Sequence, residues 1–189
     1  MGLQSKGWII VMKKILSLVL ALVMLASVSA FAEYSLTEYT YDESLFADVG
    51  GDWLAFEDFG VMFYLPDVFE ALEVSAEEAE QGVVANFATS DLSGVLSIAY
   101  GPAVDLEGNA IGFADGLADF YASLGMSNVD VVMINGLPVV SFTMPDMDML
   151  SYCLFFNDST QVVFSFAPAS SSNLALLAGL TMSSLQPVA

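Results

Sequence analysis

The sequence contains no histidine, and its only basic residues are Lys6, Lys13 and Lys14. A Ser-His-Asp or Cys-His catalytic system needs an imidazole, so these classes of hydrolase are excluded. After residue 14 there is also no side chain for a Schiff base, a P-loop or an arginine finger. After residue 14, the chain therefore lacks the side chains that most classes of enzyme use for catalysis.

The remaining charge has one sign. All 23 Asp and Glu residues lie from Glu33 onward, and the whole chain has a formal net charge of −20. Such a protein is repelled by nucleic acid and by anionic membrane surfaces, which excludes both as partners. A cationic protein or a component of the cell envelope fits this charge better.

Cysteine is limited to Cys153, so no disulfide can form within the chain. In an exported protein, a lone thiol could pair with a second chain. The surrounding segment Met149–Phe156 is mostly apolar at both odd and even positions. This pattern favours a buried, unreactive thiol.

The N-terminus has the three parts of a signal peptide. Lys13 and Lys14 precede an apolar run that ends at Leu25, and small residues lead to Ala32. We therefore predict a signal peptide over residues 1–32, with Met12 as the true start and an extracellular mature protein. An uncleaved membrane anchor is the alternative, because the uncharged run approaches the length of a membrane span.

The chain after residue 32 divides into two parts. Residues 33–50 are acidic and rich in tyrosine, without hydrophobic periodicity, and we predict a flexible acidic tether. Residues 51–189 are predicted to form a single globular domain, since their number suits one hydrophobic core.

Strands dominate the predicted domain. Asn135-Gly136 is the strongest hairpin signal, because both residues tolerate a positive φ. The expected hairpins are Trp53–Glu57 with Val61–Leu65, Val83–Thr89 with Val95–Tyr100, Val129–Ile134 with Leu137–Met144, and Met149–Phe156 with Gln161–Ala167.

Three helices are expected between and after these strands. Ser75 and Glu78 have the spacing of a capping box, which predicts a short helix. A second helix is predicted over Ile111–Leu124. The third is predicted over Ser172–Leu185, with Leu176, Leu177 and Leu180 facing inward.

The strand patterns also indicate which faces are covered. Met149–Phe156 is apolar on both faces, as expected for a central strand. Leu137–Met144 alternates between smaller, partly polar and larger apolar residues, as in a half-exposed strand. We therefore predict an α+β fold, with a mostly antiparallel sheet and helices packed on both faces.

Several segments carry a resemblance to known proteins. They are Phe63-Tyr-Leu-Pro66, the hairpin Val132–Pro138, the strands Cys153–Phe156 and Val162–Phe166, and the terminal helix. From Trp53 to Pro187 their order resembles the Mog1/PsbP-like fold, an α/β/α sandwich. The chain is also similar to small uncharacterised secreted proteins of gut Firmicutes. The resemblance implies a binding or assembly factor without chemistry of its own.

The sequence predicts no cofactor. Calcium is the alternative, because carboxylate oxygens are the ligands that it needs. Met144, Met147 and Met149 could bind a soft metal such as copper, but core packing explains them as well. The candidate calcium ligands are Asp105 and Glu107 in one segment, and Asp146 and Asp148 in another. Asp105–Asn109 alternates oxygen ligands, but a turn explains this stretch equally well. A carboxylate pair could also serve a glycoside hydrolase.

The composition and the resemblance together favour a secreted, strongly acidic, non-catalytic binding or assembly domain with an unknown partner. The alternatives are a carboxylate-based hydrolase and a surface that binds calcium or other cations diffusely.

Overall fold

The computed structural model describes residues 37–156 and 159–188. The predicted signal peptide and the first residues of the predicted tether lie outside this range. The main sheet contains β1 Thr37–Tyr39, β4 Phe69–Leu72, β5 Val83–Thr89, β6 Val95–Pro102, β7 Ser127–Ile134, β8 Leu137–Met144, β9 Met149–Phe155 and β10 Thr160–Ala167.

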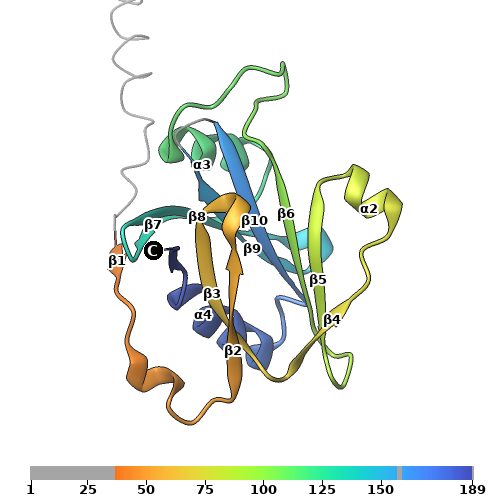
Figure 1. The fold of residues 1–189 in the computed structure, drawn as a ribbon. Helices are drawn as coiled ribbons and strands as arrows, with labels where there is room; N and C mark the ends of the chain where they lie inside the picture. The colour runs from red at the N-terminus through yellow and green to blue at the C-terminus, as the bar shows by residue number, and fades with distance from the viewer. Residues whose placement is uncertain (1–36, 157–158, 189) are drawn as a thin grey trace, which may run out of the picture. The chain divides into compact units, whose positions relative to one another are not determined.

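These eight strands follow the order β1-β7-β8-β9-β10-β6-β5-β4 (Figure 1). Strand β1 pairs with β7 in parallel, and the other neighbours are antiparallel. Strand β9 lies in the middle of the sheet, as its two apolar faces predicted. A second sheet has the order β11-β3-β2 and contains β2 Gly51–Phe56, β3 Val61–Pro66 and β11 Gln186–Pro187.

Helices complete the domain. The α-helices are α2 Ala76–Glu80, α3 Ala114–Ser123 and α4 Ser172–Ser183. Short 3₁₀ helices are η1 Glu43–Phe46, η2 Glu57–Phe59 and η3 Pro145–Met147. Among the described residues, no helix has the length and apolarity needed to cross a membrane.

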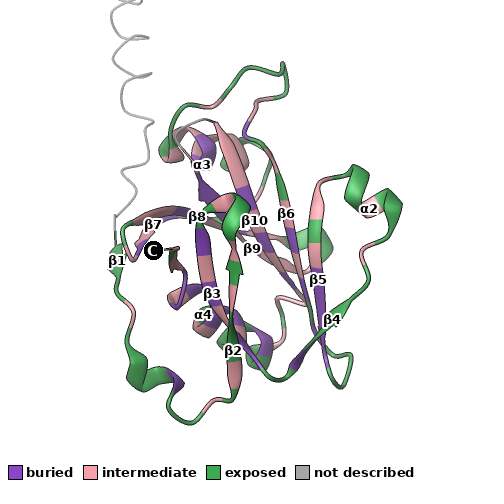
Figure 2. Ribbon diagram, viewed as in Figure 1, coloured by how far each residue is buried: buried purple, intermediate pink, exposed green. Residues whose placement is uncertain are grey.

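The main sheet is covered on both faces. On one face, Leu154 and Phe164 share a core with Phe63 of the small sheet and with Leu174 and Met182 of α4. On the other face, the core contains Leu117 and Ala118 of α3 and the sheet residues Val140, Phe142 and Cys153. Figure 2 shows buried segments along the central strands and exposed ones on α2 and η1. The prediction of an α+β fold with helices on both faces is confirmed.

Local sequence signals account for two of the connections. Asn135 and Gly136 have φ values of 48° and 80°, as the tight β7–β8 hairpin requires. At the start of α2, the N–H of Glu78 donates to the Ser75 hydroxyl at 3.3 Å. The N–H of Ser75 donates to the Glu78 carboxylate at 2.8 Å. The predicted capping box is therefore confirmed.

The predicted tether over residues 33–50 is wrong for the part that the structure describes. Residues 37–39 form the parallel edge strand β1, and Phe46 of η1 is buried. Tyr41 and Phe46 lie in an aromatic cluster with Trp53 and Tyr64, with neighbouring ring centroids 5.1–5.8 Å apart. Packing with residues distant in the sequence orders this segment, although it has no hydrophobic period of its own.

Two details of the predicted helices also differ. Helix α3 begins at Ala114, and Phe113 precedes it with 62% of its surface exposed. Leu176, predicted to face inward, is 73% exposed. Leu174, Ala178 and Met182 form the buried side of α4 instead. The apolar residues of α4 are distributed around its whole circumference, so their spacing alone did not identify the face that packs against the sheet.

Candidate functional site

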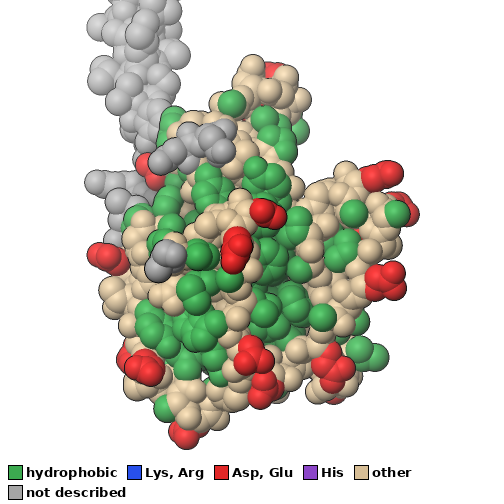
Figure 3. Space-filling model, in the orientation of Figure 1, with side chains coloured by type: hydrophobic (Ala, Val, Ile, Leu, Met, Phe, Trp, Pro, Cys, Tyr) green, Lys and Arg blue, Asp and Glu red, His purple; other side chains and the backbone are tan. Residues whose placement is uncertain are grey.

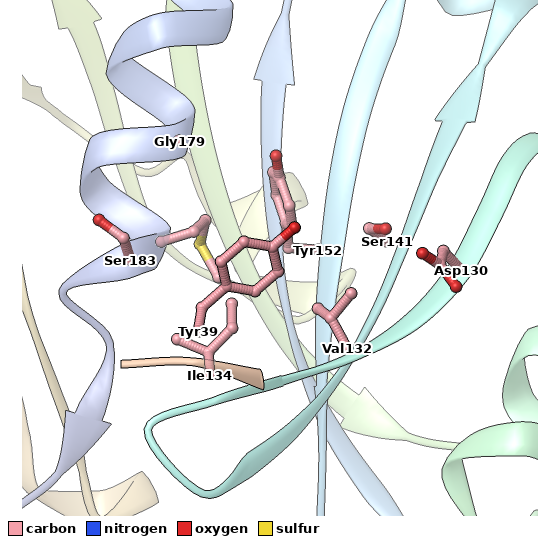
Figure 4. A pocket seen from close by; sticks show the side chains of 9 residues that line it. Tyr39, Asp130, Val132, Ile134, Ser141, Tyr152, Gly179 and Ser183 are labelled. Carbon is pink, nitrogen blue, oxygen red and sulfur yellow. The ribbon is translucent and has the colours of Figure 1, made fainter. Parts of the chain in front are cut away.

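A cavity of about 300 Å³ lies between helix α4 and the neighbouring strands of the main sheet (Figure 4). We call this cavity the tyrosine cleft. Its lining consists of Tyr39, Asp130, Val132, Ile134, Ser141, Tyr152, Gly179, Met182 and Ser183. Its volume is at the lower end of the roughly 300–1,000 Å³ typical of small-molecule sites.

The register of the sheet builds the polar side of the tyrosine cleft. Asp130 on β7 is directly opposite Ser141 on β8, and Ser141 is directly opposite Tyr152 on β9. Directly opposite residues on one sheet face have Cβ atoms about 5 Å apart. Small Ser141 therefore lies between a carboxylate and a phenol in the lining of the cavity, as the close view in Figure 4 shows.

The apolar floor follows from the same alternation. Val132 and Ile134 point to the same face as Asp130, because side chains two residues apart share a face of a strand. Both side chains are buried, and so is Met182 of α4. Tyr39 is paired with Ile134 across β1 and β7 and is 50% exposed. It forms the outer wall of the cleft.

Glycine at position 179 opens the helical side of the tyrosine cleft. A Cβ placed on Gly179 would have no neighbouring atom within 4 Å. Nearly any other residue in this turn of α4 would put a side chain into that space. Glycine is unfavourable inside a helix by about 1 kcal/mol relative to alanine, so this residue opens the cleft at some cost in stability.

Asn135 joins the two walls of the tyrosine cleft. Its backbone N–H donates to the Tyr39 carbonyl at 2.8 Å, and its side-chain oxygen accepts from the Tyr41 N–H at 2.5 Å. Its side-chain amide donates to the carbonyls of Ser183 at 3.2 Å and Leu185 at 2.7 Å. One side chain thus connects the segment after β1 to the end of α4.

The polar groups in the tyrosine cleft have few partners. The hydroxyls of Tyr39, Ser141 and Tyr152 make no hydrogen bond with another described residue. Asp130 accepts one hydrogen bond, from the Val131 N–H at 2.9 Å. Burial raises the pKa of Tyr152, and repulsion from an ionised Tyr39 phenolate would add to this effect. The cleft therefore offers several oxygen atoms and one carboxylate.

Two shallower cavities have a different character. One of about 540 Å³ is bordered by the aromatic cluster of Tyr41, Phe46, Trp53 and Tyr64, and includes Glu43. The other has a volume of about 120 Å³ and is lined by Asp58, Phe59, Tyr100, Phe156 and Thr160.

Asp105 and Glu107 lie in the turn between β6 and α3. The Asp105 carboxylate accepts from the N–H groups of Glu107 at 2.9 Å and of Asn109 at 2.8 Å. It also accepts from the Asn109 side-chain amide at 2.9 Å. These bonds, chiefly the one from the Asn109 side chain, lower the pKa of Asp105. Asp105 stabilises the turn that was the alternative explanation of this stretch.

Asp146 and Asp148 lie between β8 and β9. Asp146 is exposed in η3, whereas Asp148 accepts from the Ser170 N–H at 2.9 Å and from its hydroxyl at 2.6 Å. Within residues 37–156 and 159–188, no group of three His, Cys, Asp or Glu residues is placed to hold a metal ion. A calcium site at the four predicted residues stays a prediction.

The interior location predicted for Cys153 is confirmed. Its side chain is fully buried between the sheet and α3, and its Sγ lies 3.5 Å from the Tyr121 hydroxyl. The Tyr121 hydroxyl donates in turn to the Gln161 side chain at 3.0 Å. Burial raises the pKa of Cys153 to about 12, which keeps the thiol protonated and unreactive.

Sequence reasoning did not identify the tyrosine cleft. Asp130 carried a signal, as the one charged residue within the otherwise apolar run Val129–Ile134. Tyr39 falls within the predicted tether, Ser141 within the predicted strand Leu137–Met144, and Tyr152 within the predicted strand Met149–Phe156. Their convergence depends on the pairing of four strands. The Asn135-Gly136 turn fixes the register that places Asp130 opposite Ser141, whereas no local pattern specifies the pairing of Tyr39 on β1 with Ile134 on β7.

Comparison with known proteins adds little to this geometry. No family model matches the chain, and no curated protein matches it. A crystal structure from Bacteroides thetaiotaomicron is similar over 68% of this chain, with 17% sequence identity and a TM-score of 0.41. The matched region spans 45% of that protein.

Proposed function

We propose that this protein is a secreted, non-catalytic binding or assembly domain whose partner is cationic. The observation that carries the proposal is the charge inventory, since every charged side chain from Glu33 to the end of the sequence is acidic. The signal-peptide pattern supports secretion. The resemblance to the Mog1/PsbP-like fold supports binding or assembly.

From Glu33 onward the sequence has no basic side chain that could neutralise the acidic residues. The hydrogen bonds of Asp91 illustrate how such carboxylates are satisfied. This residue accepts from the hydroxyls of Thr89 and Ser93, each at 2.7 Å. In Figure 3, acidic side chains are spread around one face and no basic side chain is visible among the described residues. A cationic partner would supply the missing counter-charge and would be attracted over distances of about a Debye length.

The alternative of a carboxylate-based hydrolase needs two carboxylates facing each other across a cavity. The tyrosine cleft contains Asp130 alone, and each of the two shallower cavities also contains a single carboxylate. No feature of the described residues indicates catalysis. A binding role fits these cavities better than hydrolysis.

A ligand panel tests this proposal with residues 33–189. Poly-lysine, poly-glutamate, a neutral polysaccharide and an anionic polysaccharide would each be immobilised and exposed to the protein. In a parallel incubation each ligand would be kept in solution with the protein, and mass spectrometry would record any cleavage. We expect binding to poly-lysine alone, weakening as salt rises because salt screens charge attraction, and no new products. Salt-independent binding to a neutral ligand, or shortened ligand chains, would contradict the proposal.

A further inference from the structure

We propose that the tyrosine cleft is a specific site for a primary ammonium group on an alkyl stem, such as a lysine side chain or a small aliphatic amine. This inference rests on the proposed function, because it names the chemistry that a cationic partner would present. It goes further in assigning recognition to one cavity.

The charge in the tyrosine cleft selects a cation. Asp130 is half-buried and its carboxylate is the only charged group in the lining. No lysine, arginine or histidine occurs in the described part of the chain, so no described side chain can pair with it. A partly desolvated carboxylate without a cation is unfavourable, and a bound ammonium group would offset that cost.

The arrangement of acceptors suits an ammonium group rather than a guanidinium group. One oxygen of Asp130 accepts from the Val131 N–H and keeps one lone pair, while the other oxygen accepts no hydrogen bond from a described residue. Arginine prefers a carboxylate that can accept two parallel bonds, whereas an ammonium group is a point charge with three donors. The Asp130 carboxylate, the Ser141 hydroxyl and the hydroxyls of Tyr39 and Tyr152 all belong to the lining of the cleft, and they are the acceptors that it offers to such a group.

The remaining surfaces suit an alkyl stem. Val132 and Ile134 supply an apolar floor beside the polar row. Figure 4 shows the rings of Tyr39 and Tyr152 above this floor, on the side opposite Asp130. Methylene groups pack on such surfaces, and the face of a tyrosine ring attracts a cation. The open space beside Gly179 gives a ligand access along α4.

Calorimetric titration of residues 33–189 tests the assignment. The probes would be n-butylamine and N-acetyl-lysine methylamide, which separate a free amine from a lysine side chain. n-Butanol and N-acetyl-arginine methylamide would serve as uncharged and guanidinium controls. We expect saturable binding of at least one amine probe, and binding at least about tenfold weaker for both controls, since a charge-assisted bond is lost or misaligned.

Three variants locate the binding. Asp130→Asn is expected to weaken amine binding about tenfold or more, because it removes the charge while keeping the shape. Gly179→Leu is expected to abolish binding by filling the open space. Asp115→Asn changes the charge equally on α3, over the other face of the sheet, and should leave binding unchanged. Near-ultraviolet circular dichroism would confirm that each variant is folded.

Three results would overturn the assignment: equal binding of butylamine and butanol, equal effects of Asp130→Asn and Asp115→Asn, or undiminished binding to Gly179→Leu. If neither amine probe binds while poly-lysine still does, the assignment to the tyrosine cleft is wrong and the proposed function stands. If poly-lysine also fails to bind, both are wrong.

Discussion

The side chain of Asn135 is expected to contribute a large share of the stability that holds the tyrosine cleft together. It makes three hydrogen bonds, one with the Tyr41 N–H and two with the carbonyls of Ser183 and Leu185. Each such bond contributes about 0.5–1.5 kcal/mol net, and a buried partner left unsatisfied costs more. Removal of this side chain should therefore lower the free energy of unfolding by about 2–4 kcal/mol.

Asn135→Gly is the appropriate perturbation because Asn135 has a φ of 48°. Glycine adopts this backbone conformation without strain, so the variant removes the side-chain bonds and keeps the turn. Asn128→Gly is a matched control, since Asn128 has a φ of 53°, is exposed and makes one long side-chain bond of 3.5 Å to Thr143. The control should change stability by no more than about 0.5 kcal/mol.

Urea unfolding of both variants measures the difference. With a typical slope of about 2 kcal/mol per molar urea, the Asn135→Gly midpoint should fall by about 1–2 M at unchanged slope. Hydrogen exchange at the Tyr41 amide should accelerate, because the acceptor of that N–H is lost. Equal losses in the two variants would show that packing alone joins β1 to α4, and the reasoning from hydrogen bonds would be refuted.

Three further predictions concern single groups. Thr181→Val should raise stability by up to about 1 kcal/mol in a thermal melt, because the Thr181 hydroxyl is buried without a partner among the described residues; destabilisation would indicate a missed partner. Hydrogen bonds, chiefly from Ser93, lower the pKa of Asp91 to about 2. The stability they give is present above the unfolded pKa of about 4 and is lost as pH falls towards 2, so Asp91→Asn should flatten the stability profile over that interval; an unchanged profile would contradict this. Cys153 should react with a thiol reagent only after unfolding, because it is buried and its pKa is raised to about 12; rapid labelling of the native protein would contradict its burial.

The features that the sequence predicted correctly are local ones. The Asn135-Gly136 turn and the Ser75–Glu78 capping box each depend on residues within one turn of the chain. The central position of β9 also follows from local information, because a strand covered on both sides must be apolar at both odd and even positions.

The features that the sequence did not predict depend on distant contacts. Tyr41 is ordered by Asn135, 94 residues away, so the segment that contains it has no periodicity to reveal its place. The row of Asp130, Ser141 and Tyr152 follows from the register of two consecutive hairpins, and the addition of Tyr39 to it depends on the distant pairing of β1 with β7. A shift of one residue in any of these strands would turn its member of the row to the opposite face. The candidate site is thus a product of sheet register.

Two residues that lower the stability of the fold border the tyrosine cleft, and this supports a binding role for the cavity. Gly179 within α4 and the Asp130 carboxylate, which has no cation beside it among the described residues, both reduce stability. Alanine at position 179 and asparagine at position 130 would each avoid the loss. Both unfavourable features border the same cavity. Stability alone does not account for their coincidence, whereas a site that must admit a cationic ligand requires open space and negative charge together. The presence of both destabilising features at one cavity is therefore the physical argument for the proposed amine site in the tyrosine cleft.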